Sequence, residues 1–116
     1  MATTSEFIHQ SAGGESLLQI ALKFAEEIVA NDADFWTFTF RRVRAGQEWG
    51  ETIVATSNAA VTWPAGEDIP VLTEIANPLG LPLNDGDEIR GYISSTGTPA
   101  ALPRYAMRVQ LQREVL

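Results

Sequence analysis

His9 is the single histidine of this chain, and its imidazole is the side chain best suited to general base catalysis near neutral pH. A Ser/His/Asp arrangement needs such a histidine held rigidly beside a hydroxyl and a carboxylate, in a pocket backed by the core. His9 lies instead in a small, polar N-terminal stretch, and the chain has no cysteine to act as a nucleophile or thiolate ligand. We therefore expect neither a catalytic triad nor a histidine-based zinc site.

The stretch Asn84-Asp85-Gly86-Asp87-Glu88 is the best candidate for a hard cation site, because it gathers oxygen ligands around a glycine. It lacks the ligand spacing and the closing glutamate of an EF-hand loop. Asn, Asp and Gly also favour tight turns, so a structural turn before a strand explains the same residues. We expect a turn and no metal or other cofactor, and leave open whether Asp85 and Asp87 bind a cation.

Paired carboxylates for glycoside hydrolysis are the remaining catalytic possibility. The acidic residues that could supply such a pair are Glu48, Glu51, Glu67, Asp68 and Glu74. No strand-end pattern selects two of them, and any acidic chain offers similar pairs. The sequence also has no G-x-G-x-x-G, phosphate-binding loop or G-x-S-x-G elbow. We therefore expect a protein that is not an enzyme.

Arg41, Arg42 and Arg44 form the one basic cluster, in a chain whose net charge is −7. Binding of nucleic acid needs a positive field, so we expect no direct contact with DNA or RNA. Salt bridges from this cluster to Glu51, to Glu88 or to a partner subunit explain it better.

Trp36, Trp49 and Trp63 raise the question of a binding surface, because exposed tryptophans anchor protein interfaces. Trp36 belongs to an apolar strand pattern and is expected in the core. Trp49 and Trp63 lie near turns and are expected to be exposed. Together with Tyr92 they would also suit stacking on a sugar, so a carbohydrate-binding site is the alternative to a protein interface.

The segment that must position these residues is 35–44, which alternates between large apolar and polar side chains. Trp36, Phe38 and Phe40 fall on one side of a strand, with Thr37 and Thr39 on the other. A strand with one apolar face is half-buried, so it needs neighbouring strands and a cover over its aromatic rings.

We expect that cover to be an amphipathic helix over 16–30. Ser16 with Gln19 fits a capping box, and the apolar residues from Leu17 to Val29 share one broad helical face. A strand over 17–24 is the alternative, because Leu18, Ile20, Leu22 and Phe24 also alternate. Residues 1–14, which end in Gly13-Gly14, are expected to be a flexible arm, whose short apolar piece could add an edge strand or reach a neighbouring subunit.

The rest of the chain reads as short strands separated by turns. The expected strands are 51–57, 61–63, 69–76, 88–94 and 105–112. Pro70 makes 69–76 an edge or bulged strand, because proline cannot donate into a ladder. Residues 15–116 are thus expected to form one mainly β domain of the α+β type: an antiparallel β-sandwich or open barrel with one N-terminal helix.

The hydropathy of the chain and its N-terminal residues indicate where in the cell the protein is expected. No window approaches the roughly 18 apolar residues that a membrane span needs, and residues 1–10 do not resemble a secretory signal. We expect a protein made in the cytoplasm that stays there or leaves as part of something larger, without membrane contact.

The segment from Asp85 to Gly97 and the alternating tail from Tyr105 to Glu114 resemble small β-sandwich structural proteins of tailed bacteriophages. Those are head-decoration or cement proteins and the β-modules of tails and fibres. The resemblance spans about residues 35–114 and rests on texture: short Thr/Ala/Gly/Pro-rich strands, no cysteine, acidic charge and an N-terminal arm. The expected helix departs from the plainest such domains, and the resemblance carries over no functional residue.

The resemblance implies a non-enzymatic virion protein whose partners are its own copies and other virion proteins, with the virion as its location. The sequence offers an arm, an edge-type strand and aromatic loops as contact surfaces. The expected interface residues are Phe7, Ile8, Trp49, Trp63, Ile69 and Val71. A carbohydrate-binding or adhesin-type module remains the alternative function.

Overall fold

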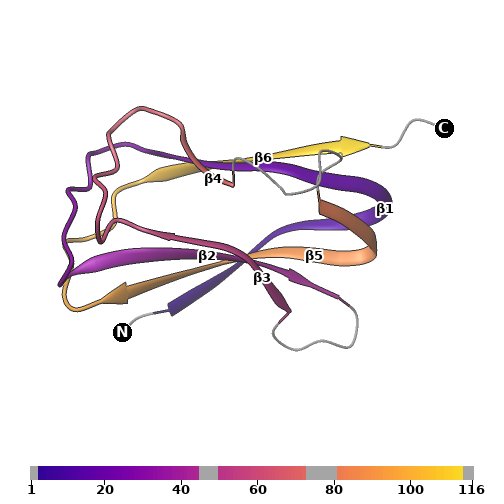
Figure 1. The fold of residues 1–116 in the computed structure, drawn as a ribbon, viewed down its shortest axis with the longest axis horizontal. Helices are drawn as coiled ribbons and strands as arrows, with labels where there is room; N and C mark the ends of the chain where they lie inside the picture. The colour runs from indigo at the N-terminus through magenta and orange to yellow at the C-terminus, as the bar shows by residue number, and fades with distance from the viewer. Residues whose placement is uncertain (1–2, 45–49, 73–80, 114–116) are drawn as a thin grey trace.

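The protein folds as one antiparallel sheet of six strands that curls into a half-barrel (Figure 1). The computed structural model describes residues 3–44, 50–72 and 81–113. The strands are β1 (Thr3–Phe24), β2 (Phe35–Val43), β3 (Glu51–Ser57), β4 (Ile69–Leu72), β5 (Leu81–Thr96) and β6 (Tyr105–Arg113). Their order in the sheet is β3-β2-β5-β1-β4, and β6 also pairs with β1.

β1 and β5 form one long ribbon that bends back on itself, so both strands contribute to both walls of the half-barrel (Figure 1). Pairing runs from Thr3↔Ser94 to Leu17↔Leu81, with register shifts on either side of Ala12. Gly13 and Gly86 lie at this bend with φ of 89° and 88°, a region that side-chain-bearing residues rarely adopt. Glycine is therefore what allows the two strands to turn together.

The two walls share this ribbon and differ in their other strands. One wall holds the first half of β1, the second half of β5, β2 and β3. The other holds the second half of β1 between β6 and β4. The core fills the space between the walls.

The expected helix over 16–30 is wrong: the described residues contain no helix, and residues 16–24 belong to β1. The alternative of a strand over 17–24 agrees with the structure. A register shift between Leu17 and Gln19 turns Leu17 and Ile20 to the same buried side, and this spacing of three residues imitates a helical face. Pairing with β6 along this segment then decides the conformation, because long-range contacts override local propensity.

Residues 3–14 are likewise not a flexible arm in the structure. They form the first half of β1 and pair with β5. Gly13-Gly14, which suggested a flexible break, lies at the bend of the ribbon. The idea that the N-terminal piece adds a strand to the domain is the one that agrees with the structure.

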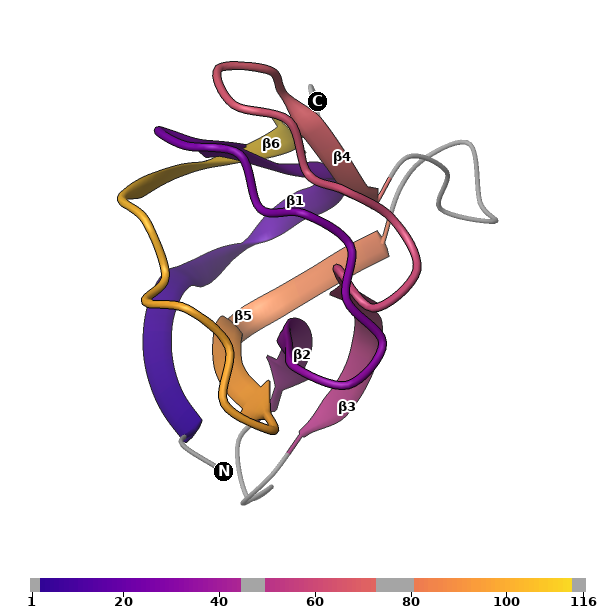
Figure 2. The same ribbon diagram turned by 90° about the vertical axis from the view of Figure 1, so that its left-hand side faces the viewer.

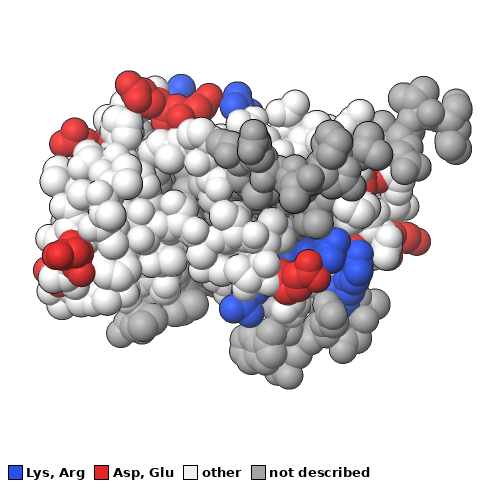
Figure 3. Space-filling model, viewed as in Figure 1, with Lys and Arg blue, Asp and Glu red and all other residues white. Residues whose placement is uncertain are grey.

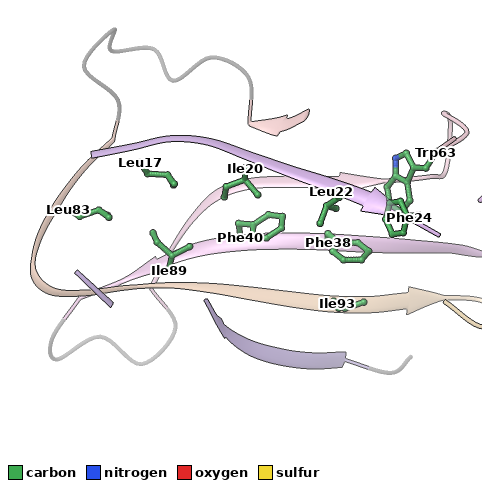
Figure 4. Close-up of a cluster of buried hydrophobic side chains, with 10 residues drawn as sticks. All are labelled: Leu17, Ile20, Leu22, Phe24, Phe38, Phe40, Trp63, Leu83, Ile89 and Ile93. Atoms are coloured by element: carbon green, nitrogen blue, oxygen red, sulfur yellow. The ribbon is translucent and has the colours of Figure 1, made fainter. Parts of the chain in front are cut away.

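The alternation in 35–44 correctly predicted β2 and its buried face. Phe38 and Phe40 are fully buried, and Trp36 is half-buried against the core. Their cover is the second half of β1 rather than a helix, as the close-up in Figure 4 shows. Leu22 and Phe24 of β1 lie across from these rings.

The other expected strands have mixed outcomes. Strands 51–57 and 105–112 are confirmed as β3 and β6, and 88–94 lies within the longer β5. β4 covers only Ile69–Leu72, and residues 73–76 lie outside the described residues. Residues 61–63 are not a strand; only Trp63 forms an isolated bridge, with Ile28. The described residues also include no helix that is long and apolar enough to cross a membrane.

Candidate functional site

The first half of β1 is an edge of the sheet. Thr3–Gln10 pairs with β5 on one side. β6 pairs with the other side of β1 only from Glu15 to Phe24, so in the described part of the chain no strand pairs with that side of Thr3–Gln10. Figure 2 shows this indigo segment at the outer margin of the sheet. We call the unpaired side of Thr3–Gln10 the open β1 edge.

The open β1 edge lacks the prolines and basic side chains that β4 and β6 carry, as does β3, the strand at the other end of the sheet. Edge strands are usually protected from unwanted pairing with other chains. Prolines, charged side chains or a short strand length provide this protection. β4 has four residues including Pro70, and β6 carries Arg108 and Arg113. Thr3–Gln10 contains no Pro, Lys or Arg, and its only charged or titratable residues are Glu6 and His9. Its row of backbone N–H and C=O groups can therefore accept another strand.

His9 lies beside a carboxylate and a hydroxyl at the bend of β1. Its Nε2 is 3.2 Å from Glu15 Oε2, and Ser11 Oγ donates to Glu15 Oε1 at 3.3 Å. A nucleophile would need the histidine to accept the serine proton, whereas here Glu15 contacts both side chains. Ser11 is 2% exposed and also accepts the backbone N–H of Gly13 at 3.0 Å. The group is placed to hold the bend, and a substrate could not reach the hydroxyl.

Sequence reasoning missed this cluster, because it assigned His9 to a flexible arm. The signal that could have found it is Gly13-Gly14, which is as typical of a bulged strand as of a linker. A strand assignment would have brought His9, Ser11 and Glu15 close together across the bend.

Asp87, one of the two aspartates considered as cation ligands, is buried and bonded within the chain. Its Oδ2 accepts the N–H of Asn84 at 2.8 Å and lies 3.2 Å from Arg44 Nε. The expected turn at 84–87 lies inside β5, at the bend opposite Ala12. Among the residues that the structure describes, no three His, Asp or Glu side chains group as metal ligands.

One expected salt bridge of the basic cluster forms, between Arg42 and Glu51, and Glu88 pairs with Arg90 of its own strand. Arg42 Nη2 donates to both carboxylate oxygens of Glu51 at 2.9 Å, and Arg90 Nε lies 2.9 Å from Glu88 Oε2. The guanidinium of Arg41 lies 5.2 Å from the centre of the Tyr92 ring, a cation–π distance. Figure 3 shows basic atoms beside an acidic group where β2 ends. Arg41 and Arg42 thus have partners within the chain.

A pocket of about 360 Å³ lies at the opposite end of β2, beside the half-buried Trp36. It is lined by Glu26, Glu27, Ile28, Val29, Asn31, Asp34, Trp36, Asn58, Thr98, Pro99, Ala100, Ala101 and Pro103. Its lining contains carboxylates and no Lys or Arg, and Figure 3 shows acidic groups along this margin of the molecule.

Buried hydrogen bonds fix the walls of the Trp36 pocket. Asn58 is 2% exposed; its Oδ1 accepts the backbone N–H of Trp36 at 2.8 Å, and its Nδ2 donates to the Val29 carbonyl at 3.0 Å. Trp36 Nε1 donates to the carbonyl of Ala100 at 3.0 Å. Asp34 Oδ1 accepts the backbone N–H of Thr98 at 2.8 Å. The pocket is therefore preformed, as ligand pockets usually are.

The expected interface residues fall in different places. Trp63 is a correction: it is 2% exposed and stacks on Phe24, because a turn residue can fold inward onto an aromatic core. Ile69 and Val71 are half-buried on β4, and Ile8 is half-buried near Gly91. The backbone of Phe7 lies on the open β1 edge. Trp49 lies outside the described residues.

The chain matches no family model, no curated protein and no solved structure.

Proposed function

We propose that this protein is a non-enzymatic structural component of a bacteriophage virion, either a capsid decoration or cement protein or a β-module of the tail. Its partners are copies of itself and other virion proteins. The observation that carries the proposal is the open β1 edge, which offers an incoming strand an unprotected row of backbone groups. The virion is then its location.

The internal use of the chemically suitable side chains supports an assembly role over a catalytic one. Glu15 hydrogen-bonds both His9 and Ser11 at a bend, and Asp87 pairs with Arg44. The texture of the sequence adds the likeness to small phage β-sandwich proteins. A curled antiparallel sheet is compatible with that class, although fold alone does not assign function.

Particle composition tests this proposal directly. Phage particles are purified on a density gradient from the host in which the chain is produced, and their proteins are identified by mass spectrometry. We expect peptides of this chain in the particle fraction at a fixed copy number relative to the capsid protein. A chain that stays in the soluble lysate and is absent from the particles would contradict the proposal.

Incorporation of tagged variants then tests the open β1 edge. The double variant Thr3→Lys/Ser5→Lys puts charges on this edge, and Gln110→Lys/Gln112→Lys puts the same charges on exposed positions of β6. We expect the first variant to be lost from particles and the second to be retained. Circular dichroism of both verifies that each remains folded.

A carbohydrate-binding module is the second candidate, and the Trp36 pocket is the observation that favours it. Its volume of about 360 Å³ falls within the range of small-molecule sites, and an indole wall with carboxylate and amide acceptors suits a sugar ring. The candidate glycan site proposed here is therefore the Trp36 pocket, since Trp63 is buried.

A glycan panel titrated against tryptophan fluorescence tests this second candidate. Binding in the pocket predicts a saturable change that Trp36→Phe removes and Trp49→Phe leaves in place. A panel without any response, or a response that only Trp49→Phe removes, would exclude the Trp36 pocket as a glycan site.

A further inference from the structure

We propose that the open β1 edge binds the same edge of a second copy of this chain, so that two sheets continue into one across a two-fold axis. This inference rests on the proposed function and names the partner at that edge. The joined sheet has the order β3-β2-β5-β1 in one copy, followed by β1-β5-β2-β3 in the other.

The backbone of Thr3–Phe7 is regular enough for such pairing. Each residue of this run pairs in turn with β5, from Thr3↔Ser94 to Phe7↔Arg90, and the first register shift follows Phe7. A run in register on one side presents regularly spaced N–H and C=O groups on the other. An antiparallel pair of identical strands is two-fold symmetric, so one edge serves as both donor and acceptor.

Full overlap of this run determines the register. Antiparallel pairing of Thr3–Phe7 with itself sets Ser5 opposite Ser5 on the axis and Thr4 opposite Glu6. Glu6, the only charged residue of the run, then faces a threonine. An axis at Glu6 would set two carboxylates opposite each other, which destabilises a cross-strand pair.

The size and charge of the contact predict how it behaves. A short ladder buries much less than the about 1,600 Å² of a standard stable interface, so the pairing is weak in dilute solution and favoured where copies are concentrated. Each copy carries a net charge of −7, so the copies repel one another at low salt. Association is therefore expected to strengthen as salt screens this repulsion.

Single-cysteine cross-linking tests the pairing, and the chain is suited to it because it has no cysteine. Paired positions of antiparallel strands have Cα atoms about 4.5–5.5 Å apart, which a disulfide can bridge. Ser5→Cys is compared with Gln110→Cys, an exposed position in β6, during mild oxidation at several protein and salt concentrations. We expect Ser5→Cys to form disulfide-linked dimers at least about tenfold faster, and faster still at higher salt. Equal rates at the two positions would overturn the inference.

The unmodified chain provides the second measurement. Sedimentation velocity should show a monomer–dimer equilibrium that Ser5→Lys abolishes and Gln110→Lys leaves unchanged. A chain that stays monomeric up to millimolar concentration overturns self-pairing. If the chain is monomeric and is nevertheless found in virions, self-pairing is wrong and the proposed function stands. If the chain dimerises but is absent from virions, the proposed function is wrong.

Discussion

The ring of Phe24 stacks on the indole of Trp63, with centroids 5.1 Å apart and planes within 4° of parallel. Phe38 meets both rings edge-on at 5.8 Å. These three rings come from β1, β2 and the connection between β3 and β4 (Figure 4). Trp63 therefore packs the connection between β3 and β4 against both walls of the half-barrel.

Replacement of Trp63 tests this aromatic stack. We expect Trp63→Ala to lower the free energy of unfolding by about 3–5 kcal/mol, because it removes a large buried ring and leaves a cavity. The matched control is Val61→Ala, two residues away at a position 62% exposed, where a change within about 0.5 kcal/mol is expected. Urea denaturation measures both, and similar losses in the two variants would contradict the assigned role.

Gly97 and Gly66 form a natural pair for testing close contact. Both have positive φ, 69° and 70°, so alanine strains the backbone at either site. A Cβ at Gly66 meets nothing within 4 Å, whereas at Gly97 it would collide with the Asp34 carboxylate and the Ala33 carbonyl. We expect Gly66→Ala to cost about 1–2 kcal/mol and Gly97→Ala about 1–3 kcal/mol more. Thermal unfolding compares them, and equal costs would show that the contact between Gly97 and Asp34 is loose.

Glu15 contacts both His9 and Ser11 at the bend of β1. Its replacement should therefore lower the free energy of unfolding more than replacement of an exposed carboxylate does. Glu15→Ala removes the acceptor of Ser11 and the partner of His9, and leaves a nearly buried hydroxyl without that bond. The expected loss is about 1–3 kcal/mol. Glu26→Ala, at an exposed position, serves as the control and should be close to neutral. Chemical denaturation decides, and a neutral Glu15→Ala would mean that the glycines alone hold the bend.

Arg42 is a buried cation whose carboxylate partner is exposed. Its side chain is 8% exposed, and that of Glu51 is 55% exposed. Glu51→Ala leaves a buried guanidinium with a neutral acceptor, the Pro82 carbonyl, and we expect a loss of about 1 kcal/mol because solvent screens the pair. Arg42→Met keeps much of the volume and removes the charge, so it should be tolerated better than Arg42→Ala. If Arg42→Ala proves the more stable of the two, the side chain contributes nothing through packing.

The strands that the sequence predicted well are those with clear alternation and a single apolar face. β2 and β6 belong to this class, and their buried and exposed positions follow the period of two. β1 was harder because a bulge after Leu17 brings Leu17 and Ile20 to one side, a spacing that also fits a helix. No local pattern shows that residues 105–113 will pair there and select the strand.

The candidate sites were less predictable than the strands. The open β1 edge depends on where β6 stops along β1, and that is a property of the assembled sheet. Trp36 was expected in the core and is half-buried against it, where it also lines a pocket. Trp63 was expected at the surface and lies in the core. Position near a turn does not reveal which way a tryptophan folds. The salt bridge between Arg42 and Glu51 was predictable because pairing of β2 with β3 sets these two residues opposite each other, whereas Arg90 and Glu88 lie two residues apart on β5.

Because Thr3 pairs with Ser94 and Phe24 with Tyr105, the ladders of β1 with β5 and β6 cannot form until these last two of the six strands have been synthesised. Contacts of such long sequence separation fold slowly. The nascent first strand would meanwhile present both of its sides to other chains. Production at low temperature or with a holding chaperone should therefore raise the yield of native protein more than any change to its surface.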